Sequence, residues 1–339
     1  MKWLKRIVVA LVVALAVLAG ISLLLPSQVM VERTVLIDAP QATVFAVLDG
    51  YRLFNKWSPW ADLDPNAKYT YEGPDFGVGA RMAWSGDEHV ESGSQTITAS
   101  APYETIASKL QFVPMGEAAA RFALSREASA TKVAWGFEYR CGVNPLNRYM
   151  GLLMRRYIAH DFDKGLGRLK ELVESLPRTD FAGLEVEVAD AGPVTVAYVA
   201  TSCAKDELEI ARTIGASYMQ IGEFMKARGL RQVAAPITID TRRDETAYVF
   251  DAAIPIDRVP EGEVPADSPV RVKTTYAGKV LKVTHKGAYR DLPRTYERLS
   301  AWAAAHGYEP AAPPWNEYAK DPGTTPEPEL VTNIYLPVS

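Results

Sequence analysis

The second half of the chain carries the same pattern twice. At a shift of 78 positions, similar residues meet in five pairs: Tyr218 with Tyr296, Ile221 with Leu299, Phe224 with Trp302, Gly229 with Gly307, and Pro236 with Pro314. Each copy reads strand, strand, helix, strand, strand. One amphipathic helix on one half-sheet leaves apolar surface exposed, so two such units are expected to bury each other. The repeat predicts two pseudo-symmetric ββαββ units with a ligand-sized groove between them.

One glutamate interrupts the match between the copies. The strand after the helix reads Ile237-Thr238-Ile239 in the first copy and Trp315-Asn316-Glu317 in the second. Alternation along a strand places the first and third residue of each triplet on one face. The first copy fills that face with isoleucine, which is typical of a core. A carboxylate facing such a core is costly unless it is paired, so Glu317 is the strongest candidate functional residue.

Length and composition limit the classes of protein to which this chain can belong. A chain of 339 residues predicts two domains with separate cores. A formal net charge of −4, with both signs mixed along the chain, argues against a nucleic acid partner. Cys141 and Cys203 stand far apart, and the four histidines form no ligand pair. No phosphate loop, dinucleotide glycine motif or GxSxG motif occurs, so we expect neither a metal site nor a cofactor.

The chain begins with a membrane signal. Lys2, Lys5 and Arg6 precede an uncharged apolar run over residues 7–25, which Pro26 closes. The run is close to the roughly 20 residues that cross a bilayer. It predicts a membrane anchor over residues 1–27 with its amino terminus in the cytoplasm and both domains outside it, in the periplasm if the source is Gram-negative. A cleaved signal peptide is the alternative. The apolar character through Leu25 favours the uncleaved anchor.

Residues 28–176 predict an α+β domain of many strands closed by one long helix. Strand-like alternation recurs between turn residues, and apolar residues three to five apart run from Met150 to Val173. Gly165 and Gly167 lie within that helix, where glycine costs about 1 kcal/mol against alanine. Close approach to the sheet would explain both glycines. Trp57 and Trp60 are predicted to be structural, whereas three other aromatic residues either line a cavity or fill it: Trp84, Phe112 and Trp135.

This first block resembles the polyketide cyclase/START-like superfamily (SRPBCC, helix-grip). Four stretches carry the resemblance: Asp38-Ala39-Pro40 leading to Val44-Phe45, residues 55–60, residues 79–84, and residues 163–166 in the closing helix. The resemblance implies a curved antiparallel sheet that grips a long C-terminal helix. Members bind lipids, hormones or polyketides between sheet and helix, so a ligand in this cavity is implied as well.

A linker over residues 177–183 leads to a second block, residues 184–339, which resembles the GyrI-like small-molecule-binding domain, also called the effector-binding domain. The resemblance rests on Gly287-Ala288-Tyr289 with Leu292, the helix through Tyr296, Leu299 and Trp302, Glu317-Tyr318, Asp321-Pro322, Thr325-Pro326 and residues 334–338. In that family a glutamate between the halves meets cationic or polar ligands among aromatic side chains, and Glu317 is the matching position. The family's regulators carry a DNA-binding helix-turn-helix, which this chain lacks.

Three roles for Glu317 remain open at this point. It attracts a ligand cation beside the faces of Trp315, Tyr248 or Trp302; it acts as a general acid or base, as in GyrI-like hydrolases; or it pairs structurally with Arg290, Arg294 or Lys320. We favour the first role. The sequence thus predicts a membrane-anchored, extracytoplasmic protein that binds an apolar or cationic small molecule. The expected ligand-binding residues are Glu317, Trp315, Tyr218, Tyr248, Tyr289 and Trp302. A hydrolase with Glu317 as its catalytic residue is the alternative, and a purely structural or docking protein comes third.

Overall fold

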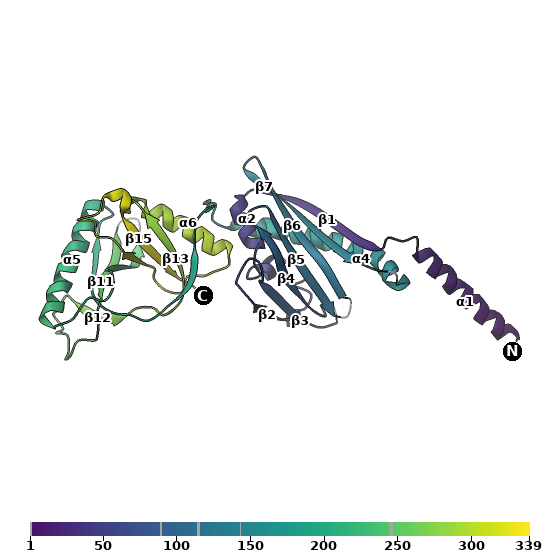
Figure 1. The fold of residues 1–339 in the computed structure, drawn as a ribbon, viewed down its shortest axis with the longest axis horizontal. Coiled ribbons are helices and arrows are strands. Elements are labelled where there is room, and N and C mark those ends of the chain that lie inside the picture. Colours follow the sequence, from purple (N-terminus) through teal and green to yellow (C-terminus); the bar gives the residue numbers. More distant parts are fainter. Residues whose placement is uncertain (1, 89, 114–115, 143, 244–246) are drawn as a thin grey trace. The chain divides into compact units, whose positions relative to one another are not determined.

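The computed structural model describes residues 2–88, 90–113, 116–142, 144–243 and 247–339. The chain forms two compact units, and the division falls between Asp180 and Phe181, with residues 305–307 assigned to the first unit. Both units combine helices with antiparallel sheets, so the fold class is α+β (Figure 1).

Helix α1 (Lys2–Ser22) precedes the first sheet. Its large apolar side chains, from Trp3 to Ile21, are between 45% and 67% exposed. The helix is long and apolar enough to cross a membrane. Its carboxyl end is bound by α4 (Pro145–Ser175). The Arg148 guanidinium donates hydrogen bonds to carbonyl oxygens of Ser22, Leu23 and Leu25, at 3.1–3.3 Å. These bonds satisfy carbonyl groups that a helix end leaves without an internal partner.

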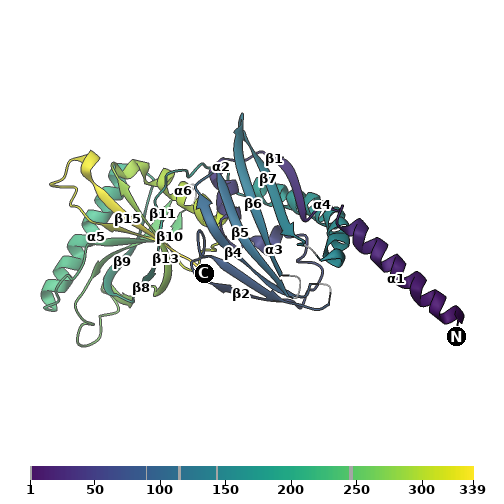
Figure 2. The ribbon, with the colours of Figure 1, turned by 45° about the vertical axis from the view of Figure 1, so that its right-hand side comes forward.

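The first unit is built on a seven-stranded antiparallel sheet in the order β1-β7-β6-β5-β4-β3-β2 (Figure 2). The strands are β1 (Gln28–Ile37), β2 (Lys68–Glu72), β3 (Arg81–Ser85), β4 (Ser92–Ala101), β5 (Thr105–Val113), β6 (Gly116–Glu127) and β7 (Ala130–Arg140). Two short helices, α2 (Gln41–Leu48) and α3 (Phe54–Trp57), lie between β1 and β2 in the chain. Side chains alternate in burial along β7, as expected for a sheet with one covered face.

Helix α4 covers this sheet, and its packing explains one of the two glycines that the sequence analysis singled out. The Asn144 side chain caps the helix by accepting a hydrogen bond from the Leu146 amide at 3.0 Å, and Pro145 takes the first helical position. A Cβ atom on Gly165 would lie only 2.9 Å from Trp135, so glycine permits the close approach that the sequence predicted. The same expectation is wrong for Gly167, which faces open space.

The second unit contains an eight-stranded sheet in the order β12-β9-β11-β10-β14-β15-β13-β8. The strands are β8 (Glu187–Ala191), β9 (Thr195–Cys203), β10 (Ile237–Arg243), β11 (Tyr248–Pro255), β12 (Arg271–Thr274), β13 (Gly278–Lys286), β14 (Trp315–Tyr318) and β15 (Val331–Pro337). Helix α5 (Glu207–Ala227) connects β9 to β10, and α6 (Leu292–Ala305) follows the 3-10 turn η1 (Tyr289–Asp291). A second 3-10 turn, η2 (Glu327–Glu329), precedes β15.

Both helices of this unit lie on the same face of the sheet. Helix α5 packs through Ile221 and Met225 against Ala197 and Val199 of β9. Helix α6 is attached to β14 by a 2.9 Å hydrogen bond from the Tyr296 hydroxyl to Asn316 Oδ1.

The opposite face of the sheet carries the two residues next to Asn316 in β14. Trp315 and Glu317 point away from the helices because they flank Asn316 in an alternating strand. The pairs Ile237↔Glu317 and Ile239↔Trp315 place both on the isoleucine face, as the repeat predicted.

Asp49, directly after α2, is a buried carboxyl group with one hydrogen-bond donor. It is 6% exposed, and the Ser100 hydroxyl donates to its Oδ1 at 2.6 Å. Burial raises its pKa from 3.8 to about 6, which outweighs the hydrogen bond from Ser100. A raised folded-state pKa stabilises the fold below the unfolded pKa, and this contribution is lost as the pH rises through the folded pKa.

We therefore expect Asp49→Asn to be more stable than the wild type at pH 8, by about 1–3 kcal/mol. The amide oxygen keeps the acceptor for Ser100 but carries no charge. At pH 4 the two proteins should have the same free energy of unfolding, because Asp49 is then protonated in the folded state. Urea unfolding at both pH values measures the difference, and a difference that does not change with pH would contradict the assignment.

Candidate functional sites

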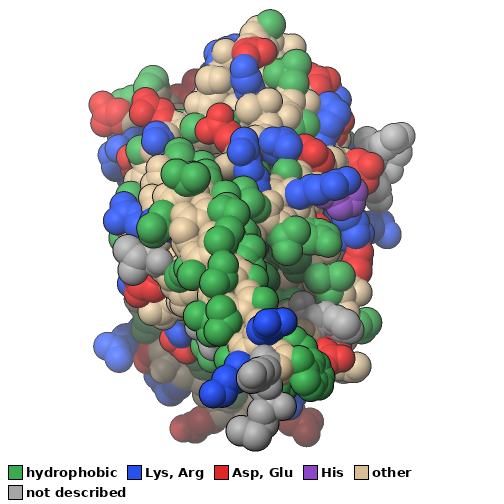
Figure 3. Space-filling view, turned by 90° about the vertical axis from the view of Figure 1, so that its right-hand side faces the viewer, with side chains coloured by type: hydrophobic (Ala, Val, Ile, Leu, Met, Phe, Trp, Pro, Cys, Tyr) green, Lys and Arg blue, Asp and Glu red, His purple; other side chains and the backbone are tan. Residues whose placement is uncertain are grey.

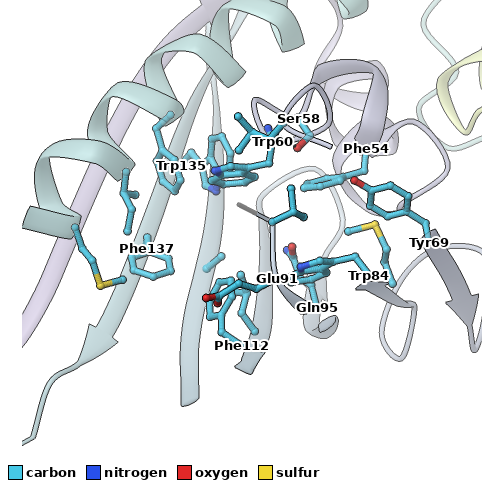
Figure 4. A pocket seen from close by; sticks show the side chains of 18 of the residues that line it. Phe54, Ser58, Trp60, Tyr69, Trp84, Glu91, Gln95, Phe112, Trp135 and Phe137 are labelled. Carbon is cyan, nitrogen blue, oxygen red and sulfur yellow. Dashed lines mark hydrogen bonds between the residues drawn. The ribbon is translucent and has the colours of Figure 1, made fainter. Parts of the chain in front are cut away.

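A cavity of about 380 Å³ lies between the first sheet and α4 (Figure 4). Its lining is mostly aromatic and aliphatic. Helix α4 contributes Met154, Ile158 and Phe162, and the sheet contributes side chains from six strands, β2 to β7. The lining aromatic residues include Trp60, Trp84, Phe112, Trp135 and Phe137. These side chains line the cavity rather than fill it, which settles the question that the sequence left open for Trp84, Phe112 and Trp135.

The strand register explains why these side chains converge. Gln95 of β4 pairs with Met82 of β3 on one side and Leu110 of β5 on the other, and all three line the cavity. Directly paired residues share a face. Trp135 of β7 stacks on Phe162 of α4, with ring centroids 3.7 Å apart and planes 8° apart, which attaches the helix to the cavity wall.

The two tryptophans predicted to be structural behave differently. Trp57 is 2% exposed and lies outside the cavity lining, packed edge-on against Trp135. Trp60 lines the cavity, so its ring lies where a ligand could contact it. Its indole nitrogen donates a hydrogen bond to Asp161 at 3.1 Å, and this bond leaves the rest of the ring available to the cavity.

Gln95 is a polar residue in this apolar lining that the sequence analysis missed. Its side chain is 7% exposed, and its amide forms no hydrogen bond with any residue in the described ranges. Further polar side chains in the lining are Ser58, Tyr69, Glu88 and Glu91. The sequence could have indicated Gln95, because alternation places this polar residue on the same strand face as Ile97, which is buried.

In the second unit, three of the predicted ligand-binding tyrosines lie on the helix face. The Tyr218 hydroxyl donates to the Ile237 carbonyl oxygen at 3.0 Å, and the Tyr248 hydroxyl donates to the Asp240 carboxylate. Tyr289 packs edge-on against Tyr318, with ring centroids 5.4 Å apart. Burial raises the pKa of all three hydroxyl groups. They are therefore neutral hydrogen-bond donors at physiological pH.

Trp315 and Glu317 lie on the opposite face. The Trp315 ring stacks on Tyr335 with centroids 4.9 Å apart and planes 10° apart. Asn333 Nδ2 donates to Glu317 Oε1 at 3.0 Å, and the Tyr335 hydroxyl donates to Oε2 at 3.4 Å. Burial, together with the Glu317 charge, raises the pKa of Tyr335 to about 12. Both donors to Glu317 are thus neutral.

No ion pair reaches Glu317 from the residues that the structure describes. Arg290, one of its three predicted structural partners, instead pairs with Glu327 at 2.6 Å. Arg294 and Lys320 form no ion pair with it either, within the same ranges. In the described part of the chain, Glu317 thus accepts hydrogen bonds from two neutral donors and has no cationic partner.

The six predicted ligand-binding residues therefore do not form one site. Trp315 and Glu317 occupy the face without helices, whereas Tyr218 and Tyr248 pack beside α5 on the other face. The sixth, Trp302, stacks on Tyr308 with centroids 6.0 Å apart. The repeat identifies equivalent positions without showing which face of the sheet the helices cover, so it could not separate these two groups of residues.

Comparison with known proteins supports both resemblances. Residues 28–174 match the model described as polyketide cyclase / dehydrase and lipid transport, and residues 184–339 match the GyrI-like small molecule binding domain. A search of curated proteins finds no match.

Three solved structures illustrate the likeness. The EcmrR C-terminal domain is 20% identical, covering 46% of this chain and 98% of that one, with a TM-score of 0.41. The EcmrR–DNA complex is 18% identical, covering 57% and 72%, with a TM-score of 0.42. A hydrolase from Listeria innocua is 14% identical, covering 46% and 92%, with a TM-score of 0.34. The two family matches confirm the predicted two-domain resemblance, with the polyketide cyclase and lipid transport model over residues 28–174 and the GyrI-like small-molecule-binding model over residues 184–339.

Proposed function

We propose that this protein is held at a membrane by α1 and binds an apolar small molecule in the cavity under α4. The cavity carries the proposal: its volume of about 380 Å³ falls in the range of about 300–1,000 Å³ typical of ligand sites. Its wall is apolar, and transfer of apolar surface from water into such a site gains about 25 cal/mol per Å². A ligand that fills it would gain affinity chiefly from this burial.

Fluorescence titration with 1-aminoanthracene, a neutral apolar probe, tests this function. Trp60, Trp84 and Trp135 line the cavity, so a bound probe should quench tryptophan emission by energy transfer. The full chain in lipid nanodiscs should bind one probe per chain saturably, with empty nanodiscs as the background. Quenching that rises linearly with probe concentration, as in simple partition into lipid, would contradict the proposal.

The exposed apolar surface of α1 supports membrane anchoring, and α4 extends that surface. Four apolar residues of α4, at a spacing of four, three and four, share one helix face: Leu146, Met150, Leu153 and Tyr157. They are 68%, 48%, 58% and 70% exposed. Arg155 and Arg156 lie on the same turns, as in helices that meet a bilayer surface. Figure 3 shows hydrophobic side chains along α1 with Lys and Arg side chains beside them.

The basic residues before the apolar run support an orientation with both domains outside the cytoplasm. Alkaline phosphatase fused after Ser339 should then be active, because that enzyme requires an extracytoplasmic location. The matched control replaces Lys2, Lys5 and Arg6 with glutamate, which should lower the activity by removing the orientation signal. An inactive fusion with the natural amino terminus would reverse the proposed topology.

A second candidate function is cation binding at Glu317. The observation behind it is a carboxylate that receives two neutral donors, forms no ion pair in the described part of the chain, and adjoins the stacked Trp315 and Tyr335 rings. Aromatic faces beside a carboxylate attract organic cations, at about 0.5–2 kcal/mol per ring.

The strand register supports a pseudo-symmetric arrangement with Glu317 at its centre. Thr238 pairs with Asn316, and these two residues are also equivalent under the shift of 78 positions. Two equivalent residues that pair with each other lie on the pseudo-two-fold axis that relates the two copies. The neighbouring pair, Ile237 with Glu317, therefore lies beside this axis, where strands β10 and β14 of the two copies meet. The hydrolase alternative, in which Glu317 acts as a general acid or base, differs from cation binding because it requires turnover of a substrate.

A further inference from the structure

We propose that Gln95 selects the ligand of the cavity, and that this ligand is an apolar molecule with one neutral hydrogen-bonding group, such as a hydroxyl, carbonyl or amide. This inference rests on the proposed function of the cavity and specifies its ligand. It depends on three observations: the burial of Gln95, the absence of a partner for its amide among the described residues, and the charges beside it.

The position of Gln95 directs its amide to the cavity. Its strand neighbours Met82 and Leu110 line the same wall, and Figure 4 shows Gln95 among the side chains that line the cavity. Those two aromatic rings meet edge-on with centroids 5.9 Å apart. The amide thus projects from an aromatic wall, where a ligand inside the cavity can reach it.

The Gln95 amide has donors and an acceptor that no described protein group occupies. Buried polar side chains nearly always form hydrogen bonds, to protein groups or to molecules in a cavity. Gln95 is only 7% exposed, and its amide has no protein partner in the described ranges. Leucine, with a similar shape, would fit this apolar wall without a polar group that requires a partner. A glutamine here is therefore explained by a hydrogen bond to something that enters the cavity.

Nearby charges restrict the chemistry of that group. Glu88 and Glu91 also line the cavity, and both are exposed, so they lie where the cavity meets solvent. Two carboxylates disfavour a ligand anion by like-charge repulsion. The cavity holds no Lys or Arg among its lining residues to offset them. A neutral polar group is therefore favoured over a carboxylate or phosphate.

Three related probes test this assignment on the full chain in nanodiscs: naphthalene, 2-naphthol and 2-naphthoate. They share one apolar skeleton and differ in the polar group. In the wild type, the hydroxyl should strengthen binding relative to naphthalene, and 2-naphthoate should bind more weakly than 2-naphthol. In Gln95→Leu, the preference for 2-naphthol over naphthalene should fall about fivefold, the equivalent of one typical hydrogen bond. Naphthalene affinity should stay the same or increase.

Gln111→Leu is the matched control. Gln111 lies on the next strand with its side chain on the outer face, exposed and donating to Glu117 at 3.3 Å. Its replacement should leave the probe preference unchanged. Gln95→Leu should melt at the same temperature as the wild type or higher, because an unpaired amide is removed.

The outcomes separate the two proposals. If naphthalene does not bind the wild type, the cavity function fails, and the role of Gln95 with it. If naphthalene binds but Gln95→Leu keeps the wild-type preference for 2-naphthol, the role of Gln95 is overturned while the cavity function stands. Stronger binding of 2-naphthoate than of 2-naphthol would overturn the proposed ligand class.

Discussion

Replacement of Ala120 by tryptophan should weaken binding of 1-aminoanthracene by at least about 30-fold, close to 2 kcal/mol of lost apolar burial. Ala120 lies on β6, is 7% exposed, and contributes its small side chain to the cavity wall. An indole at this position would occupy the space that the probe requires. The titration described above measures the loss directly.

Ala119→Trp is the control for this change, because Ala119 precedes Ala120 on the same strand and is exposed on the outer face. That variant should bind the probe like the wild type. Thermal melts show whether each variant is folded, and Ala120→Met provides a smaller obstruction should the tryptophan prevent folding. Equal affinities in folded Ala120→Trp and Ala119→Trp would mean that the probe binds elsewhere.

Replacement of Glu317 by glutamine should lower affinity for tetraphenylphosphonium, an aromatic cation, by about tenfold or more. Glutamine retains an acceptor for Asn333 but removes the charge. Stability should remain equal or increase, since no ion pair to Glu317 is formed within the described ranges. Calorimetric titration measures the affinity, and urea unfolding measures the stability.

The control is Glu327→Gln, which removes an exposed carboxylate and its ion pair with Arg290. It should leave cation affinity unchanged. A clear loss of stability in Glu317→Gln would identify a structural carboxylate and contradict the binding site. Hydrolysis of a cyclopropane-bearing electrophile by the wild type, abolished in Glu317→Gln with little change in substrate affinity, would identify a hydrolase instead.

The sequence predicted the repeat and its consequences for one strand pair. The spacing of 78 positions placed Glu317 and Trp315 on the same face as Ile237 and Ile239, and the register confirms that placement. The sequence could not show which face the helices cover, because both faces of this sheet carry apolar residues. Val199 packs beneath α5 while Val196 packs with Ile237. For that reason the sequence could not show that Tyr218 and Tyr248 lie on the face opposite Glu317.

The cavity shows a different limit of sequence reasoning. Whether Trp84, Phe112 and Trp135 fill or line the interior depends on where α4 lies, within a few ångströms. Gly165 predicted that the helix approaches the sheet closely, and a Cβ there would indeed meet Trp135 and Pro59. The space left beyond that contact depends on small residues such as Ala120, whose role becomes visible only when all strands are in place.

Mass spectrometry of an organic extract of the full chain, purified directly from cells, tests the central claim most directly. The wild type and Ala119→Trp should release the same neutral apolar molecule with one polar group, in near-equal amount to protein. Ala120→Trp should release little of it, while retaining the same membrane lipids carried by α1. A wild-type extract without such a molecule, or equal amounts from all three proteins, would contradict ligand binding in the cavity.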